Sequence, residues 1–513
     1  MLQGDRQVCA IDTETHLIEP GLLAPRLVCL SYCDGQNVGL VHREELGSKM
    51  LELLNQKGLH IVGHNIAFDM AVLAADNPSL LPAIFQAYNE GRIHDTCIRE
   101  QLIDIAAGNF RGAYRDENQK SRKREYSLAG IAHRRLKIVM EKDDWRLRYA
   151  ELTDTPIESW PEGAKEYARK DAQVTFEVYE HQKESEAVLS DVAAQARAAF
   201  ALHLMSCWGV ITDADKVREL EERLDTTLTE QKELLRSFNL LRRNGTKDMT
   251  AIRSLVESCL DNPPRTATGA VKTDEQTLAR CDHPGLVALT EYKGADKLRG
   301  TWLKHLKAGC NKPIQPNYNV LVETGRTSCS GPNLQNPHRG LGLRECFVPR
   351  KGYLYAACDY SSLEMCTLAQ VCIWLFGSSA LAVAINKGID PHLKLAAQIL
   401  AIDYDTAFGR ISSGDKEVRE VRQISKAANF GYPGGMGAEK FRQFASGYGV
   451  TLSQRQASDL RENWFNAWPE MRRYFNHISS ITNHPNGQLK QFHSNRLRGG
   501  LRFTSACNSY FQG

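Results

Sequence analysis

The stretch QVCAIDTET, residues 7–15, places two carboxylates at the end of an apolar, β-rich run. Asp12 and Glu14 are two residues apart, so on a strand both side chains lie on the same face. Alone, a pair of this kind also fits two acids on a solvated surface. Its meaning depends on the segments that follow.

Two of those segments place further acids on predicted helices. GHNIAFDM, residues 63–70, carries Asn65 and, one turn into a helix, Asp69. EYARKDAQV, residues 166–174, carries Tyr167 and Asp171 one turn apart on one helical face. The runs RLVCLSYC, NVGLVH and LHIVGHN read as strands, and EELGSKMLELL and FDMAVLAA read as helices. The pattern predicts an α/β domain over residues 1–190.

Two segments of the second half combine charge with apolar residues. In CDYSSLEMC, residues 358–366, Asp359 ends a β-leaning run over 353–357, and Glu364 follows it. In REVRQISKAANFGYPGG, residues 419–435, Arg422, Lys426 and Phe430 recur at every fourth position and share one helical stripe. Two cations and a ring would suit a triphosphate with a base to stack. The alternative is a pair of cations that extend to solvent beside one core Phe.

Composition limits the class of protein. The chain has 513 residues, enough for two or more domains, with 42% hydrophobic residues and a formal net charge of +3. Its 14 cysteines form no CxxC pair, which indicates reduced thiols rather than a zinc site or a disulfide framework. We expect a cytoplasmic protein with no membrane span. From Met471 on there is no Asp or Glu, and the cations there suit a phosphate-lined groove: Arg472, Arg473, Lys490, Arg496, Arg498 and Arg502.

The order D-x-E, N-x-x-F-D, Y-x-x-x-D over about residues 5–185 resembles the 3′–5′ exonucleases of the DnaQ-like superfamily, which share a ribonuclease-H-like fold. The resemblance implies that two Mg²⁺ or Mn²⁺ ions are held in this active site, where one activates water and the other stabilises the leaving oxygen. Tyr167 would orient the attacking water, and His94-Asp95-Thr96 would be structural. The implied metal ligands are Asp12, Glu14, Asp69 and Asp171.

The second half resembles the family A DNA polymerases, the class of bacterial DNA polymerase I and many bacteriophage replicases. Its motif A is Asp359 to Cys366, its motif B is Arg422, Lys426, Phe430 and Gly431, and its D-x-H element is Asp390 and His392. Two more elements complete the resemblance over about residues 195–513: Thr324-Gly325-Arg326 with Pro332-Asn333-Leu334-Gln335-Asn336, and Asn508, Gln512 and Gly513.

The polymerase resemblance implies roles residue by residue. Asp359 and the carbonyl of Tyr360 would bind two catalytic metals, and Glu364 would exclude a ribose 2′-hydroxyl. The deoxynucleoside triphosphate would be bound by His392, Arg422, Lys426 and Phe430. The minor groove of the primer-template DNA, whose acceptor pattern is nearly constant, would be tracked by Arg326, Asn333, Gln335, Asn336, Asn508 and Gln512.

Several residues depart from the family pattern. Ser362 and Cys366 replace a Gln and an Arg in motif A, and Gly434 stands where a Tyr is usual. The H-D-E of motif C does not occur in the sequence. We therefore expect a fragment or one part of a split enzyme whose missing carboxylate comes from a second, C-terminal polypeptide. The alternatives are a stand-alone 3′–5′ exonuclease with a DNA-binding platform, and a non-enzymatic DNA-binding remnant.

The expected fold class is an α/β ribonuclease-H-like exonuclease domain followed by a multidomain α+β right-hand polymerase with an incomplete palm. The lack of a preceding 5′-nuclease domain favours a phage replicase in the cytoplasm of a bacterial host. The expected domains are the exonuclease (1–190), the thumb and start of the polymerase (191–316), the palm with motif A (317–375), the fingers with motif B (376–480), and a return to the palm (481–513).

Overall fold

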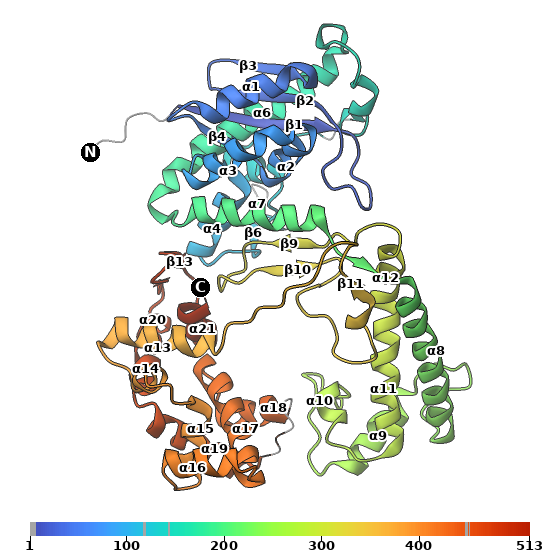
Figure 1. The fold of residues 1–513 in the computed structure, drawn as a ribbon, viewed down its shortest axis with the longest axis vertical. Coiled ribbons are helices and arrows are strands. Elements are labelled where there is room, and N and C mark those ends of the chain that lie inside the picture. Colours follow the sequence, from blue (N-terminus) through green and yellow to red (C-terminus); the bar gives the residue numbers. More distant parts are fainter. Residues whose placement is uncertain (1–6, 116–118, 142–143, 447–449, 451, 513) are drawn as a thin grey trace.

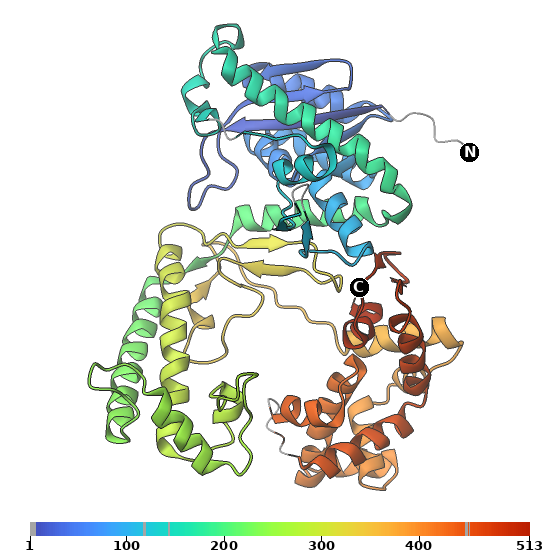
Figure 2. The same cartoon turned by 180° about the vertical axis from the view of Figure 1, so that it is seen from behind.

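The computed structural model describes residues 7–115, 119–141, 144–446, 450 and 452–512. The N-terminal domain forms one lobe, and two arms extend from it on the same side, as Figure 1 shows. One arm is green to yellow in the figure, and the other is orange to red. Figure 2 shows the same arrangement from behind.

A five-stranded mixed sheet forms the centre of the N-terminal lobe, in the order β3-β2-β1-β4-β5. The strands β1, β2 and β3 are antiparallel, whereas β4 and β5 run parallel to β1. All four strands that the sequence predicts for this lobe are present. The bounds are β1 Val8–Thr15, β2 Leu27–Cys33, β3 Val38–His42, β4 His60–Gly63 and β5 Ile93–Asp95.

Helices cover both faces of this sheet, as expected for an α/β fold (Figures 1 and 2). Along β1, Val8 and Ala10 face one core, whereas Cys9 and Ile11 face the other. Helix α6 (Glu162–Gln182) packs on the first of these faces through Ala164, Ala168 and Ala172. The helices on the second face are α1 (Arg43–Asn55), α2 (Ala67–Asp76), α3 (Leu81–Asn89) and α7 (Val192–Trp208).

Two smaller features complete the lobe. After α4 (Thr96–Ala106), strands β6 (Ala113–Arg115) and β7 (Ser121–Lys123) pair as a hairpin that leads into α5 (Leu128–Leu136). Helix α7, the first helix of the expected thumb segment, packs on the lobe itself, because Phe200 stacks on Tyr88 with ring centroids 4.8 Å apart.

The first arm is a long helical hairpin. Helices α8 (Ala214–Ser237) and α11 (Pro284–Leu298) share a core that includes Leu220, Leu224 and Leu298. A π-helical turn, Arg299–Leu303, joins α11 to α12 (Lys304–Gly309). The tip of the arm holds α9 (Met249–Cys259) and α10 (Glu275–Leu278).

The second arm is almost entirely helical. Its helices are α13 (Leu363–Phe376), α14 (Ala380–Asn386), α15 (Pro391–Ile399), α16 (Tyr404–Ser412), α17 (Lys416–Gly431), α18 (Ala438–Ser446), α19 (Gln454–Ala467), α20 (Glu470–Thr482) and α21 (Phe503–Gln512). In its core the indole N–H groups of Trp464 and Trp468 both donate to Asn429 Oδ1, at 3.1 and 3.0 Å.

Short strands connect the arms. They pair as β9 (Asn317–Asn319) with β10 (Ser328–Ser330), and as β8 (Ile211–Thr212) with β11 (Phe347–Val348). The strand expected over 353–357 is not formed, so this part of the sequence analysis is wrong. No described strand pairs with the segment, and Leu354 is 92% exposed. An apolar β-rich run becomes a strand only where a neighbour supplies hydrogen bonds.

Two of the basic C-terminal residues do not lie on a surface groove as expected. Arg496 and Arg498 are buried, and their guanidinium groups lie 3.8 Å from Asp191 and 2.7 Å from Glu323. Arg472 pairs with a carboxylate, and Arg473 lies over an aromatic ring. Arg496 and Arg498 therefore stabilise packing within the protein, whereas Lys490 and Arg502 are exposed.

A short hairpin joins the second arm to the N-terminal lobe. It consists of β12 (Leu489–Lys490) and β13 (Leu497–Arg498), and is followed by Gly499 and Gly500. A Cβ on Gly499 would lie 2.5 Å from the carbonyl oxygen of Ala106, and a Cβ on Gly108 would lie 2.6 Å from the Gly500 nitrogen. The two backbones meet where no side chain fits.

Among the described residues, no helix combines the length and the apolar character that a membrane crossing requires.

We predict that Asn429→Ala lowers the free energy of unfolding by roughly 2–5 kcal/mol, because two buried indole N–H groups lose their acceptor. Chemical denaturation measures the change. Asn466→Ala, an exposed position on the neighbouring helix α19, is the matched control and should change stability by less than about 0.5 kcal/mol. Equal effects of the two substitutions would contradict the stabilising role of Asn429.

Candidate active site in the N-terminal lobe

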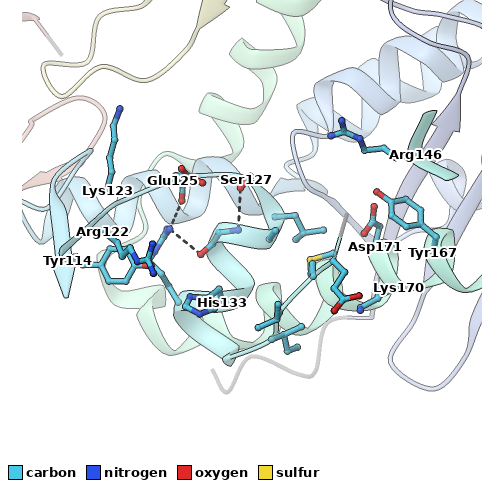
Figure 3. A pocket seen from close by; sticks show the side chains of 18 of the residues that line it. Tyr114, Arg122, Lys123, Glu125, Ser127, His133, Arg146, Tyr167, Lys170 and Asp171 are labelled. Carbon is cyan, nitrogen blue, oxygen red and sulfur yellow. Dashed lines mark hydrogen bonds between the residues drawn. The ribbon is translucent and has the colours of Figure 1, made fainter. Parts of the chain in front are cut away.

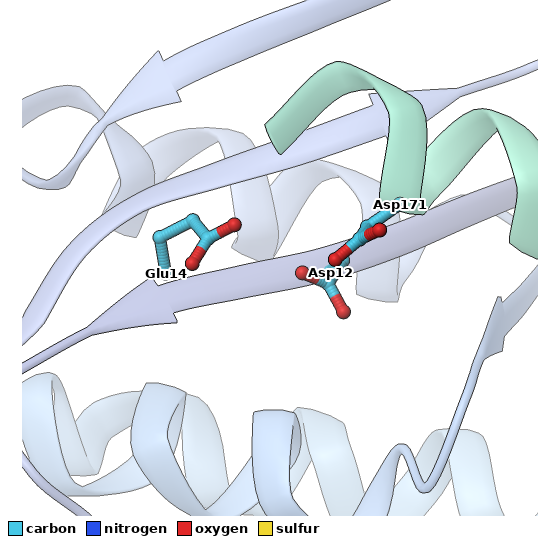
Figure 4. A group of neighbouring side chains, drawn as sticks. All are labelled: Asp12, Glu14 and Asp171. Carbon is cyan, nitrogen blue, oxygen red and sulfur yellow. The ribbon is translucent and has the colours of Figure 1, made fainter. Parts of the chain in front are cut away.

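Three carboxylates meet at the end of β1. Asp12 and Glu14 come from β1, and Asp171 comes from α6, as Figure 4 shows. One oxygen of each lies within 4.8 Å of the other two. Asp12 follows Val8 and Ala10 at the same alternation, so it lies on the face that α6 covers.

Asp69 lies beside this trio but is oriented toward the strand. It is 3% exposed, and its Oδ1 accepts hydrogen bonds from the backbone N–H and the hydroxyl of Thr13, at 3.0 and 2.6 Å. Thr13 is therefore a contributor that the sequence analysis missed. Its position between the two acids of D-x-E was the only available signal.

Burial and mutual repulsion raise the pKa values of these acids. Burial is the larger cause for Asp12 and Glu14, and the neighbouring carboxylates add to it, so both pKa values lie well above their usual range. Burial also raises the pKa of Asp69 to about 7 and that of Asp171 to about 6. Carboxylates this close together all remain ionised only when a cation lies among them.

The donor set fits a divalent metal ion. Carboxylate oxygens are the ligands that Mg²⁺ and Mn²⁺ prefer. Glu14 Oε1 is buried and accepts no hydrogen bond from any described residue, which leaves its lone pairs available to an ion. Among the described residues, this trio is the group of acids, histidines or cysteines close enough to hold one.

The remaining predicted residues of the lobe fall into two groups. Tyr167 lies one turn before Asp171, and both line the pocket that Figure 3 shows. Burial followed by the charges of Asp171 and Glu14 raises the pKa of the Tyr167 phenol. Asp95 is structural, because its carboxylate accepts from the backbone N–H groups of Cys97, Ile98 and Asn65. The interpretation of His94-Asp95-Thr96 as a structural element agrees with these contacts.

In the second arm a polar chain surrounds Glu364. The carboxylate of Glu364 forms an ion pair with Arg326 and accepts from Gln512 Nε2 at 3.4 Å. Gln512 in turn donates to Asn508 Oδ1 at 3.3 Å. Asn508 lies over Gly434, where its side-chain nitrogen is 3.2 Å from the position of a Cβ. The amide of Asn508 thus occupies the space that the missing side chain at 434 leaves.

Helix α17 presents the predicted stripe. Arg422 donates to Asp390 Oδ2 from Nε at 2.7 Å and from Nη2 at 2.6 Å, which ties the D-x-H element to this helix. The ring of Phe430 lies 5.5 Å from that of His392, and Asn429 Nδ2 contacts His392 Nδ1 at 3.0 Å. Burial lowers the pKa of His392 to about 4. Lys426 is half-buried on the same stripe.

The other predicted DNA-contacting residues lie on the loop after β10. Asn333 and Asn336 line an open cleft of about 1150 Å³ with residues of the first arm that include Lys293, Lys297 and Lys304. Gln335 donates to Thr327 Oγ1 at 2.7 Å. The predicted set thus divides into this cleft and the chain around Glu364. Gly513 lies outside the described residues.

Asp359 and Tyr360 lie in the exposed segment between the arms. Tyr360 is 78% exposed. Within the described ranges, Asp359 belongs to no group of three metal-ligating side chains. The structure therefore brings together the acids of the N-terminal lobe but leaves Asp359 apart from any comparable set.

Comparisons with known proteins find matches for both the N-terminal and the C-terminal half of the chain. The profile described as "DNA polymerase family A" matches residues 214–497, and the profile described as "3′-5′ exonuclease" matches residues 2–184. The chain is 25% identical over 503 residues to DNA polymerase I of Chloroflexus aurantiacus, which covers 91% of this chain and 48% of that protein. It is 28% identical over 273 residues to DNA polymerase I of Aquifex aeolicus, with 51% and 44% covered.

A solved structure shares the fold. The polymerase domain of Pol1 from M. smegmatis, in complex with DNA primer-template and dNTP, has a TM-score of 0.69 and 18% identity, and the match covers 100% of this chain and 83% of that one. The chain spans less than half the length of the curated relatives it matches, 44% and 48% for the two named above.

We predict that this acidic centre destabilises the metal-free protein as pH rises. The folded-state pKa values exceed the unfolded values, so the folded form binds more protons between them and its stability falls as pH increases from about 4 to about 7. Asp171→Asn should raise stability by roughly 1 kcal/mol at about pH 8 in the presence of a chelator. Thermal unfolding at several pH values measures this.

The same thermal unfolding measured with Mg²⁺ tests whether these acids bind the metal. The ion should raise the midpoint of the parent more than that of Asp171→Asn, since it binds the folded site. Asp154→Asn, an exposed acid of the same lobe, is the control and should leave both the pH dependence and the Mg²⁺ effect unchanged. A metal effect of equal size in Asp171→Asn would contradict the assignment.

Proposed function

Because this chain belongs to DNA polymerase family A and carries a 3′–5′ exonuclease domain, we propose that its N-terminal lobe removes nucleotides from the 3′ end of DNA. The observation that carries this proposal is the meeting of Asp12, Glu14 and Asp171 within 4.8 Å. A complete set of metal-binding acids in the lobe favours an enzyme over a DNA-binding remnant.

The acids of the site and Tyr167 would have separate roles in this reaction. Asp12, Glu14 and Asp171 would hold Mg²⁺ or Mn²⁺, two ions per site, which supply an activated water and stabilise the leaving oxygen. Asp69 fixes the strand between the two acids of β1 through Thr13. Tyr167, whose phenol stays protonated, can donate a hydrogen bond that orients the water.

For the second half we propose template-directed DNA synthesis, with the thumb, palm and fingers at the boundaries given above. Arg422, Lys426 and His392 would bind the triphosphate of a deoxynucleotide, and Phe430 would stack on it. Arg422 is already oriented by Asp390, which reduces the entropy lost on binding. Asn333, Gln335 and Asn336 would contact the primer-template duplex. The M. smegmatis domain that shares this fold is described with both ligands.

The polymerase metal site is proposed on Asp359 and the carbonyl of Tyr360. The comparisons give no support for the expected second polypeptide with motif C, which stays a prediction. A phage origin likewise stays a prediction. The likeness to bacterial DNA polymerases I supports action in the cytoplasm of a bacterial cell.

Glu364 is proposed to exclude a ribose 2′-hydroxyl, and the residues around it supply its orientation. Arg326 and Gln512 both hold its carboxylate, and Asn508 holds Gln512. Substitution of Arg326 or Gln512 should therefore reduce the preference for deoxyribonucleotides over ribonucleotides.

The exonuclease proposal is tested by Asp12→Asn with Glu14→Gln. We expect the release of nucleotides from single-stranded DNA with Mg²⁺ to fall by about 10²–10³-fold, since several kcal/mol of charge stabilisation disappears. Glu52→Gln, an exposed position on α1, is the control and should retain the parental rate. Parental activity in the double variant would overturn the assignment of these two acids.

The role of Gln512 is tested by binding of dATP and ATP to the protein–primer-template complex. Gln512→Ala should reduce the preference for the deoxynucleotide by about 3–10-fold, the size expected when one hydrogen bond to a charged group is removed. Gln454→Ala, an exposed position on α19, should leave the preference unchanged. The proposal fails if Gln512→Ala weakens both nucleotides equally.

A further inference from the structure

The β12–β13 hairpin lies between the N-terminal lobe and α21 (Figures 1 and 2). Two of its side chains are buried although both are polar. Gln491 is 0% exposed, and Arg498 is 4% exposed. Because polar groups are buried in folded proteins only where they find hydrogen-bond partners, the partners of these two residues show which segments the hairpin connects.

Gln491 joins two segments that are distant in sequence. Its side-chain nitrogen donates to the carbonyl oxygen of Ser509 on α21 at 2.8 Å and to that of Thr324, between β9 and β10, at 3.1 Å. Its Oε1 accepts from the hydroxyl of Ser494 at 2.9 Å. Both sides of the amide group thus have partners, and the side chain is fixed in one orientation.

Arg498 joins the same two segments. Its Nη2 donates to Glu323 Oε2 at 2.7 Å, in the segment between β9 and β10. Its Nη1 donates to the carbonyl oxygen of Ser505 at 3.2 Å and to the hydroxyl of Ser509, both on α21. Since the planar guanidinium presents its donors in fixed directions, this segment and α21 are held at one separation.

Both connected segments contact the carboxylate of Glu364. Arg326 lies two residues beyond Thr324 and forms an ion pair with Glu364 Oε1. Gln512 lies one turn beyond Ser509 and donates to the same oxygen. One carboxylate oxygen is therefore held from two sides, by segments that the hairpin ties together.

On the side of Gln512 the distance is fixed without the hairpin. Helix α13 carries Glu364, and one turn further on the hydroxyl of Thr367 donates to the carbonyl oxygen of Phe511 at 2.8 Å. Phe511 directly precedes Gln512 on α21. A change in the hairpin should therefore leave the contact between Gln512 and Glu364 in place.

On the side of Arg326 the position depends on the hairpin. The backbone forms a tight turn before this residue, in which the N–H of Gly325 donates to the carbonyl oxygen of Val322 at 2.9 Å. Gln491 and Arg498 bind this turn to α21. Loss of their bonds would let the turn shift as a unit and carry Arg326 away from the carboxylate that it holds.

We propose that Gln491 and Arg498 are positioning residues for the selection of the sugar, because they hold Arg326 against Glu364. The inference rests on the proposed role of Glu364 and gives the β12–β13 hairpin a part in specificity. A carboxylate held by two donors keeps one orientation, whereas a carboxylate held by one donor can turn aside and admit a ribose 2′-hydroxyl.

The test is a double-mutant cycle on the relative binding of dATP and ATP to the protein–primer-template complex. Gln491→Leu keeps the size of the side chain but removes its donors, and should reduce the preference for dATP by about threefold, roughly the contribution of one hydrogen bond. Arg326→Ala should reduce the preference at least as much. Because Gln491 acts through Arg326, the double variant should show the same preference as Arg326→Ala alone.

The same hairpin offers a matched control. Gln488→Leu removes a bond of 3.1 Å from this side chain to the carbonyl oxygen of Ala106 in the N-terminal lobe. It should lower the thermal stability, as Gln491→Leu does, but leave the preference for dATP unchanged. An equal loss of preference in both variants would overturn the inference, since the effect would then follow stability alone.

Glu323→Gln provides a second variant that leaves the buried residues of the hairpin intact. The Glu323 side chain is 49% exposed, so its substitution weakens the pair with Arg498 at the surface. The preference for dATP should fall by about twofold, the usual size for a partly exposed ion pair. This measurement decides the matter even where Gln491→Leu does not fold.

Two further outcomes separate this inference from the function on which it rests. If the effects of Gln491→Leu and Arg326→Ala multiply in the double variant, the hairpin acts independently of Arg326 and the inference is wrong. It is also wrong if Glu323→Gln and Gln491→Leu keep the parental preference while Glu364→Ala loses it. Parental preference in Glu364→Ala would instead refute the proposed role of Glu364.

Discussion

The close approach of α6 to the central sheet is the packing on which the N-terminal site depends. Ala164, Ala168 and Ala172 recur at every fourth position, so the helix rests almost directly on β1 and β2. Larger residues would push the helix outward, and Asp171 would move away from Asp12 and Glu14 with it. Packing of small side chains thus brings together carboxylates that repel one another.

Sequence patterns predicted the parts of the structure that short segments determine. The strand that carries Asp12 and Glu14 and the helical stripe of Arg422, Lys426 and Phe430 both form where local periodicity places them. The orientation of Asp69 toward Thr13 could not be predicted from the sequence, because it depends on how α2 packs against β1.

Tertiary context overturned one expectation completely and another at two of its residues. The β-rich run over 353–357 is exposed and forms no strand, since strand formation needs a partner that local sequence does not reveal. Arg496 and Arg498 are buried between segments distant in sequence, where their charges meet Asp191 and Glu323. A basic composition alone does not distinguish a cation that binds phosphate from one that holds two elements together.

The glycine contact between Gly108 and the pair Gly499–Gly500 has a geometric consequence for how the second arm packs on the N-terminal lobe. Backbone contacts backbone there, so these two segments lie as close together as two chains can. A methyl group added at any of these glycines would push the two segments apart, and the second arm would shift relative to the carboxylates of the lobe.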